Sequence, residues 1–184
     1  MPGGPARGRA GRAVTQERRT LYRATYLLVA AAILILDQWS KTIVIRELAI
    51  HESREVLGDF FLLSYVRNTG AAFGLFAGIE SHLKSVLLNC VAVGAFLAVS
   101  YYAFRSPARS VRLQVGLALV LGGAVGNLVD RVRFGYVIDF LLFGVRGHYW
   151  PAFNVADSAI CTGVGLLALD MLRPKATAPV SPVV

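Results

Sequence analysis

The chain has 184 residues, of which 55% are hydrophobic and 16% are charged, and its mean hydropathy is +0.57. One small globule cannot bury that much apolar surface, so the composition excludes an ordinary soluble domain and indicates a protein of the lipid bilayer. The net charge of +8 does not indicate nucleic-acid binding, because the basic residues lie at the ends of apolar runs and in the tails, without interleaved aromatic residues.

Residues 1–20 are rich in glycine, proline and arginine and show no apolar periodicity. They are predicted to form a disordered cytoplasmic tail. An apolar run then begins near Leu21 and continues towards Ile45, with the polar segment 37–41 in its C-terminal part. A cleaved signal peptide would have a shorter apolar core and a small-residue cleavage site, so this run is interpreted as a retained membrane helix.

Three further apolar runs each have about 17 to 22 residues, the length needed to cross a hydrocarbon core of about 30 Å. They cover residues 83–104, 113–129 and 155–172. Small residues at 122–126 and 162–165 would let helix backbones approach closely in lipid. The sequence therefore predicts an all-α membrane domain over residues 21–172, with four transmembrane helices, and a second cytoplasmic tail at residues 173–184.

The segments between these helices indicate how the chain is oriented. Both tails and the short arginine-containing loop at residues 105–112 fall on one side, which the positive-inside rule makes cytoplasmic. Residues 46–81 and 132–153 fall on the other side, and each contains a short run of β-forming residues, at 56–66 and 136–143. These runs predict a small β-structured cradle on the outer, periplasmic face of the membrane.

An ionisable side chain at membrane depth costs roughly 2.5 to 3.5 kcal/mol, so each one needs a physical reason. The predicted topology brings four of the six aspartates to the outer face: Asp37, Asp130, Asp139 and Asp157. Three of them have a structural explanation. Asp37 can pair with Lys41 one helical turn later, and Asp130 can pair with the adjacent Arg131 at a helix end. Asp157 lies in the first turn of a helix that begins with an asparagine cap, where the helix dipole favours a carboxylate.

Asp139 is the hardest of the four to explain as a structural residue, because it lies inside the hydrophobic stretch 137–141 with no adjacent cation. Burial there would raise its pKa, as a general acid or base requires. Two close carboxylates that share one proton can activate water and protonate a leaving amine. The segment 51–55 lacks the second histidine of a zinc-peptidase motif, and the sequence has no nucleophile elbow and no phosphate-binding loop. No metal and no other cofactor is expected.

A small ion-coupled transporter is the alternative function, because aspartates within a membrane can also relay ions. Transporters usually have internal repeats and broken helices, and no repeat relates the two halves of this chain. A non-catalytic assembly factor is a third hypothesis, but it would not need two unpaired carboxylates on one face. The spacing of the aspartates does not by itself decide among these functions.

Four segments, in this order along the chain, resemble the lipoprotein signal peptidase (signal peptidase II) family. They are residues 37–41 (DQWSK), 67–74 (RNTGAAFG), 122–140 (beginning GGAVGNLVDR and ending VIDF) and 151–158 (PAFNVADS). One such motif would be weak, whereas four in the right order within the predicted helices are specific. The resemblance covers residues 21–172 and leaves only the tails outside.

The resemblance implies an aspartic peptidase without a metal, whose catalytic residues in this chain are Asp139 and Asp157. It implies that four further polar residues line or brace the substrate site: Asn68, Asn127, Arg131 and Asn154. Asp37 and Lys41 are expected to support the fold, and Asp130 is expected to be a structural polar residue at its helix end.

Members of the family cleave the signal peptide of a prolipoprotein just before a cysteine that already carries diacylglycerol. The resemblance therefore implies that the partners are such prolipoproteins and membrane lipid, with no nucleic acid, and the chain is expected to be a monomer. The expected location is the bacterial inner membrane, which the chain crosses several times, with both termini cytoplasmic and the active site at the outer face.

Overall fold

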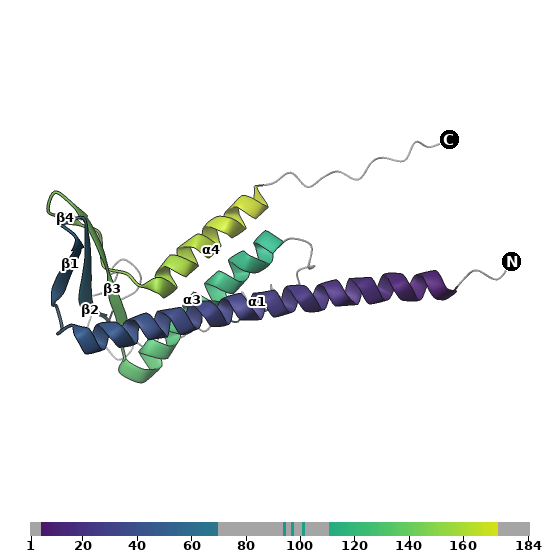
Figure 1. Cartoon of the computed structure of the whole chain (residues 1–184), viewed down its shortest axis with the longest axis horizontal. Helices are drawn as coiled ribbons and strands as arrows, with labels where there is room; N and C mark the ends of the chain where they lie inside the picture. The colour runs from purple at the N-terminus through teal and green to yellow at the C-terminus, as the bar shows by residue number, and fades with distance from the viewer. Residues whose placement is uncertain (1–4, 70–93, 95–96, 98–100, 102–110, 173–184) are drawn as a thin grey trace.

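The computed structural model describes residues 5–69, 94, 97, 101 and 111–172, with side chains from residue 24 onward. The described elements are, in chain order, α1 (Pro5–Glu47), β1 (Ser53–Leu57), β2 (Phe61–Asn68), α3 (Val111–Phe134), β3 (Val137–Val145), β4 (His148–Tyr149) and α4 (Val155–Met171). Figure 1 shows the strands at one end of the helices, where α1 ends and α4 begins.

α1 is one continuous helix of 43 residues, about 65 Å long at 1.5 Å per residue. We expected residues 1–20 to be disordered, whereas the structure has helix from Pro5 onward. Proline fits the first turn of a helix, and the alanines and arginines that follow have good helix propensity, so local propensity favours a helix without an apolar face. The part from Ala24 to Glu47 is long and apolar enough to cross a membrane.

The two later helices agree with the sequence. α3 has 24 residues and is also long and apolar enough to cross a membrane, which confirms the helix predicted at 113–129. α4 has 17 residues and confirms the helix predicted at 155–172. Of the helix predicted at 83–104, only three residues are described, all of them helical. The rest lies outside the described residues, and α4 is not among the described helices that are long and apolar enough to cross a membrane, so the count of four transmembrane helices stays a prediction.

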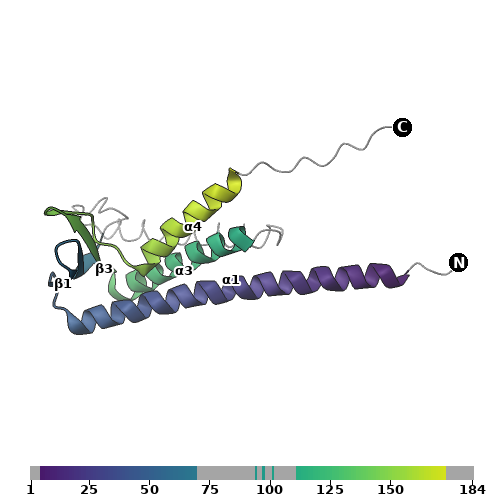
Figure 2. The ribbon, with the colours of Figure 1, turned by 45° about the horizontal axis from the view of Figure 1, so that its top comes forward.

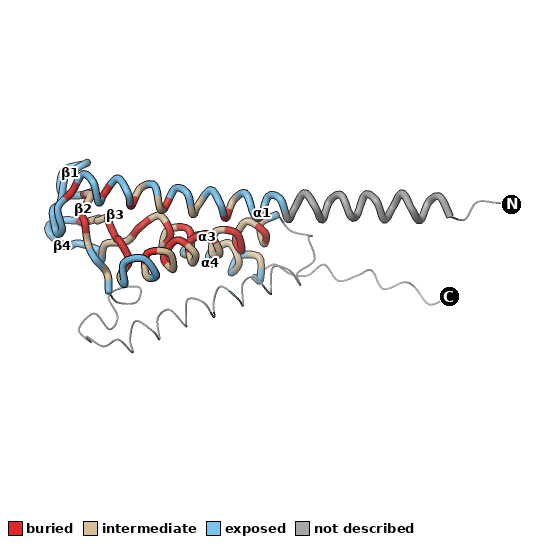
Figure 3. The backbone as a smooth tube through the Cα atoms, turned by 90° about the horizontal axis from the view of Figure 1, so that it is seen from below, coloured by how far each residue is buried: buried red, intermediate tan, exposed pale blue. Residues whose placement is uncertain are grey.

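α3 packs against the C-terminal half of α1, whereas α4 packs mainly on α3 and slopes away from α1 (Figures 1 and 2). The side of α1 that faces them is the buried side (Figure 3). Glycines allow this close approach. A Cβ added at Gly122 would lie 2.6 Å from Ala30 O of α1, and one at Gly163 would lie 2.6 Å from Gly116 O of α3. A Cβ at Gly123 would collide with the backbone of α4. The predicted role of small residues in helix packing is therefore confirmed at these three glycines, whereas a Cβ added at Gly165 would meet no atom of the described residues within 4 Å.

The strands form an antiparallel sheet in the order β1-β2-β3-β4, which confirms the predicted β-structured segments. β1 and β2 form a hairpin whose connection contains Gly58, with a φ of +51° that a glycine adopts without strain. β2 and β3 lie far apart in the sequence, and their register sets Val66 opposite Asp139 and Asn68 opposite Val137. This pairing brings the end of β2 next to the start of β3.

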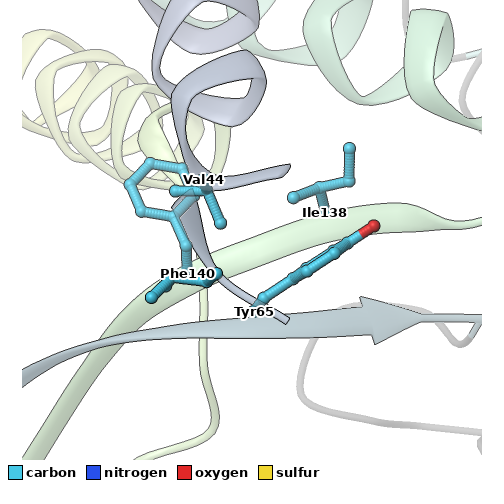
Figure 4. Packing of buried hydrophobic residues seen from close by; sticks show 5 residues of the cluster. Val44, Tyr65, Ile138 and Phe140 are labelled. Carbon is cyan, nitrogen blue, oxygen red and sulfur yellow. The ribbon is translucent and has the colours of Figure 1, made fainter. Parts of the chain in front are cut away.

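A small apolar cluster joins the end of α1 to the sheet. Val44 of α1 and Leu48, which follows the end of α1, pack against Tyr65 of β2 and against Ile138 and Phe140 of β3 (Figure 4). Burying each of these large side chains stabilises the fold by roughly 1.5 to 3 kcal/mol. Because side chains alternate along a strand, the aspartate between the two β3 residues points the other way, towards the start of α4.

Candidate active site

Five segments meet where the helices reach the sheet, and each carries polar residues predicted for the site. α1 contributes Asp37 and Lys41, β2 contributes Asn68, α3 contributes Asn127 and Asp130, β3 contributes Asp139, and the start of α4 contributes Asn154 and Asp157. Hydrogen bonds and ion pairs join all eight side chains into one network.

Asp139 of β3 is held by two asparagines. Its Oδ1 accepts a hydrogen bond from Asn154 Nδ2 at 2.7 Å, and its Oδ2 accepts one from Asn68 Nδ2 at 2.8 Å. Only 1% of the residue is exposed. Both partners are neutral amides, so they fix the carboxylate in place without supplying a positive charge in direct contact with it.

The environment of Asp139 favours its protonated form. Burial, and then the negative charge of Asp157, raise the pKa of Asp139 to about 7. The hydrogen bonds from Asn68 and Asn154 and the charge of Lys41 oppose this rise. The predicted upward shift is therefore confirmed, and near neutral pH the group is suited to give or take a proton.

Asp157 lies in the first turn of α4. Its backbone N–H donates to Asn154 Oδ1 at 2.9 Å, which confirms the predicted asparagine cap. Its Oδ1 accepts a hydrogen bond from Asn127 Nδ2 at 2.8 Å. Within the described part of the chain, Oδ2 has no hydrogen-bond partner, so the described residues hold one oxygen of this carboxylate and not the other.

Asn154 connects the two aspartates. Its Nδ2 donates to Asp139 and its Oδ1 accepts from the Asp157 backbone, so one fully buried side chain contacts both residues. Its Nδ2 also lies 3.2 Å from Asn127 Oδ1 and 3.3 Å from Ile138 O. The two carboxylates are close enough for the charge of Asp157 to change the protonation of Asp139. This arrangement suits two carboxylates that share one proton.

A second pair of carboxylates lies beside the first and surrounds a cation. Lys41 Nζ is 2.8 Å from Asp37 Oδ2 and 2.8 Å from Asp130 Oδ2, and only 2% of the lysine is exposed. We call Asp37, Lys41 and Asp130 the charged triad. The predicted pairing of Asp37 with Lys41 is confirmed.

The predicted partner of Asp130 was wrong. We expected the adjacent Arg131, whereas the ion pair is made with Lys41 of α1. Successive residues on a helix point in different directions, so Asp130 faces α1 and Arg131 does not share that face. Arg131 is half-buried and acts on the site through its charge, which attracts Asp157 and Asp139.

The charged triad also holds the backbone on which the two other aspartates lie. The N–H of Ile138 donates to Asp130 Oδ2 at 3.1 Å, and the N–H of Ala156 donates to Asp37 Oδ1 at 2.9 Å. The two donor residues, Ile138 and Ala156, directly precede Asp139 and Asp157 in the sequence. The triad therefore fixes the positions of both strand and helix at the site.

Sequence reasoning missed Gln38. Its Nε2 donates to Asp130 Oδ1 at 2.9 Å and also reaches Asp37 Oδ2 and Gly126 O, each at 3.2 Å. The one indication of this role in the sequence was the place of Gln38 inside the motif at 37–41. A glutamine next to an aspartate does not by itself predict a hydrogen bond to another helix. Among the described residues, no three histidine, cysteine, aspartate or glutamate side chains gather in a way that could hold a metal ion.

The class of protein follows from the fold, which this chain shares with membrane enzymes. Two solved structures described as bacterial membrane enzymes have the same fold, with TM-scores of 0.73 and 0.74 and 32% sequence identity. The matches cover 81% and 83% of this chain and 88% and 95% of those chains.

Sequence comparisons identify the family. The family model for signal peptidase (SPase) II matches residues 29–173. The lipoprotein signal peptidase of Syntrophotalea carbinolica is 46% identical over 80% of this chain and 90% of its own length. That of Geobacter metallireducens is 43% identical over 82% of this chain and 91% of its own length. The chain belongs to the signal peptidase II family.

Proposed function

We propose that this chain is an aspartic endopeptidase that removes signal peptides from prolipoproteins, with Asp139 and Asp157 as its catalytic residues. Membership of the signal peptidase II family supports the removal of a signal peptide. The attachment of both aspartates to the single side chain of Asn154 supports the aspartic mechanism.

In this mechanism one carboxyl group of the pair is protonated and the other is ionised when the substrate binds. The ionised carboxylate takes a proton from a water molecule, whose oxygen attacks the carbonyl carbon of the scissile bond. The protonated carboxyl gives its proton to the carbonyl oxygen, which forms a neutral tetrahedral intermediate. The carboxyl that took the proton from water then gives it to the leaving nitrogen, and the C–N bond breaks. A hydroxyl group of the intermediate returns its proton to the other carboxylate as the new carboxyl group forms, so the pair again holds one proton.

The other polar residues hold this pair in place. Asn68, Asn127 and Asn154 donate hydrogen bonds to carboxylate oxygens of the pair, and amides do so without titrating. Arg131 supplies a positive charge near both aspartates, where it can stabilise negative charge that develops on the carbonyl oxygen.

The substrate is a prolipoprotein whose cysteine, just after the cut, carries diacylglycerol. Several large apolar side chains of α1 support a lipid-facing surface beside the site: Leu28, Ile35 and Trp39 are 70%, 66% and 63% exposed. The N-terminal end of α1 and the C-terminal end of α4 both point away from the sheet (Figure 1), which supports cytoplasmic termini and an outer-face site. The chain acts as a monomer in the bacterial inner membrane.

The test uses the purified chain in lipid vesicles, with a prolipoprotein that does or does not carry diacylglycerol. Burying an acyl chain contributes about 0.8 kcal/mol per CH₂, so the lipidated precursor should be cleaved and the unmodified one hardly at all. The released peptide is measured by mass spectrometry, which also locates the cut. Equal turnover of both precursors would refute the role of the lipid. Ion flux into the vesicles without peptide release would favour the transporter.

A further inference from the structure

Lys41 links the charged triad to the catalytic pair through the side chain of Asn127. An ammonium group has three protons, and the structure provides three acceptors. They are Asp37 Oδ2 and Asp130 Oδ2, both at 2.8 Å, and Asn127 Oδ1 at 3.1 Å. Two ion pairs therefore hold the ammonium group in place, and its third proton points to one amide oxygen.

This third contact decides which way round the Asn127 amide lies. An ammonium group only donates hydrogen bonds, so the oxygen of the amide must face Lys41. The amide nitrogen then faces Asp157 and donates to its Oδ1 at 2.8 Å. If the amide turned over, its NH₂ group would face the ammonium group and its oxygen would face a carboxylate, and both contacts would be repulsive. Asn154 Nδ2 also donates to Asn127 Oδ1, which favours the same orientation.

We propose that Lys41 is a positioning residue for the catalytic pair, because it holds the Asn127 amide in the orientation that places Asp157. Its loss then lowers turnover in addition to any effect on folding. This role goes beyond the support of the fold that the sequence predicts for Lys41, and it rests on the proposed catalytic role of Asp139 and Asp157.

Lys41 also contributes its charge to the site. The charged groups of the described residues that act on Asp139 include Asp157 from α4, Lys41 from α1 and Arg131 from α3. The groups that donate hydrogen bonds to it are neutral amides. Lys41 opposes the rise in the pKa of Asp139, so removing its charge should move the alkaline limb of the activity profile to higher pH. A residue that only supports the fold would leave that limb unchanged.

The test measures kcat, KM, activity against pH and thermal melting for Lys41→Arg and Lys41→Met in the full-length protein. Arginine keeps a positive charge beside both carboxylates, but its planar fork cannot reproduce the three contacts of an ammonium group. We expect Lys41→Arg to melt close to the wild type, with kcat at least about 10-fold lower and KM little changed. Lys41→Met should lower kcat by about 100-fold or more and shift the alkaline limb upward. Arg54→Met removes an exposed cation of β1 and should leave every value unchanged.

A wild-type kcat in Lys41→Arg would overturn the proposal. If neither Lys41 variant folds, Asn127→Asp decides, because it keeps an oxygen towards Lys41 and removes the donor to Asp157. A wild-type kcat in that variant would also overturn it. Activity retained in Asp139→Asn and Asp157→Asn would instead overturn the proposed function, so the two failures are distinguishable.

Discussion

Two groups of carboxylates share one hydrogen-bonded network, and they differ in the groups that face them. Asp37 and Asp130 each lie 2.8 Å from the ammonium group of Lys41. Asp139 and Asp157 accept hydrogen bonds from asparagine amides instead. An opposite charge in contact compensates a buried carboxylate, whereas an amide holds a carboxylate in place and leaves most of its charge uncompensated.

The difference shows how four aspartates at one end of a helical bundle can divide between two tasks. The charged triad neutralises part of its own charge and fixes the backbone beside the site. Asp139 and Asp157, the proposed catalytic pair, keep an unbalanced charge, which makes sharing one proton favourable. Substitutions and changes of pH should therefore affect the two groups differently.

The largest effect concerns the catalytic pair acting as a unit. Asp139→Asn and Asp157→Asn should each lower turnover by about three or more orders of magnitude, and the double variant should be hardly slower than either one. The reason is that either substitution leaves only one carboxyl group, so the two residues can no longer share a proton. Turnover of the lipidated precursor by equal amounts of folded protein checks this. Losses that multiply in the double variant would show that the two residues act independently.

The second effect concerns pH. The pKa of Asp139 is raised to about 7, and the pair needs one proton to act, so activity should fall as the pH rises above about 7. Each further pH unit should lower kcat/KM by about tenfold. The profile belongs to the pair and not to one residue. Activity that stays level up to pH 9 would show that the pair does not need a shared proton, and would contradict the proposed division between the pair and the charged triad.

The third effect concerns the charged triad. Asp130→Asn should act mainly through stability, because the residue bonds to Lys41, Gln38 and the backbone of Ile138 rather than to the catalytic pair. Losing a hydrogen bond to a charged group costs about 1.5 to 3 kcal/mol. We expect a lower melting temperature in detergent and a kcat within about tenfold of the wild type. A catalytic loss without a change in melting would move Asp130 into the catalytic group.

The smallest effect is a pH-dependent stability. The folded-state pKa of Asp139, about 7, lies above its usual value of 3.8, so the folded state binds more protons between these values. Stability therefore falls as the pH rises through about 7, on the order of 2 kcal/mol between pH 5 and pH 8. Asp139→Asn should lack this fall, so its melting temperature relative to the wild type should rise over that range. Parallel melting curves would contradict a buried, titrating Asp139.

Local chemistry allowed the sequence to predict part of this site. The i,i+4 spacing predicted the pair of Asp37 and Lys41, and the cap pattern predicted the contact of Asn154 with Asp157. Asp139 was identified because nothing near it in the sequence could compensate it. The four family motifs supplied the remaining asparagines.

The rest depends on contacts between segments that are distant in the sequence. Asn68 and Asp139 are 71 residues apart and meet only because β2 pairs with β3. The ion pair of Lys41 with Asp130 depends on the packing of α1 against α3, and the nearest cation in the sequence, Arg131, was the wrong choice. The start of α1 at Pro5 was missed because apolar periodicity carries no signal for a polar helix.

The most direct test of the division between the two groups measures turnover and melting temperature side by side for Asp→Asn variants of all four aspartates. We expect Asp139→Asn and Asp157→Asn to fold with undiminished melting temperatures and to release almost no signal peptide. We expect Asp37→Asn and Asp130→Asn to melt earlier and to keep a kcat within about tenfold of the wild type. Substantial peptidase activity in either Asp139→Asn or Asp157→Asn would contradict the proposed division and reopen the choice among the four aspartates.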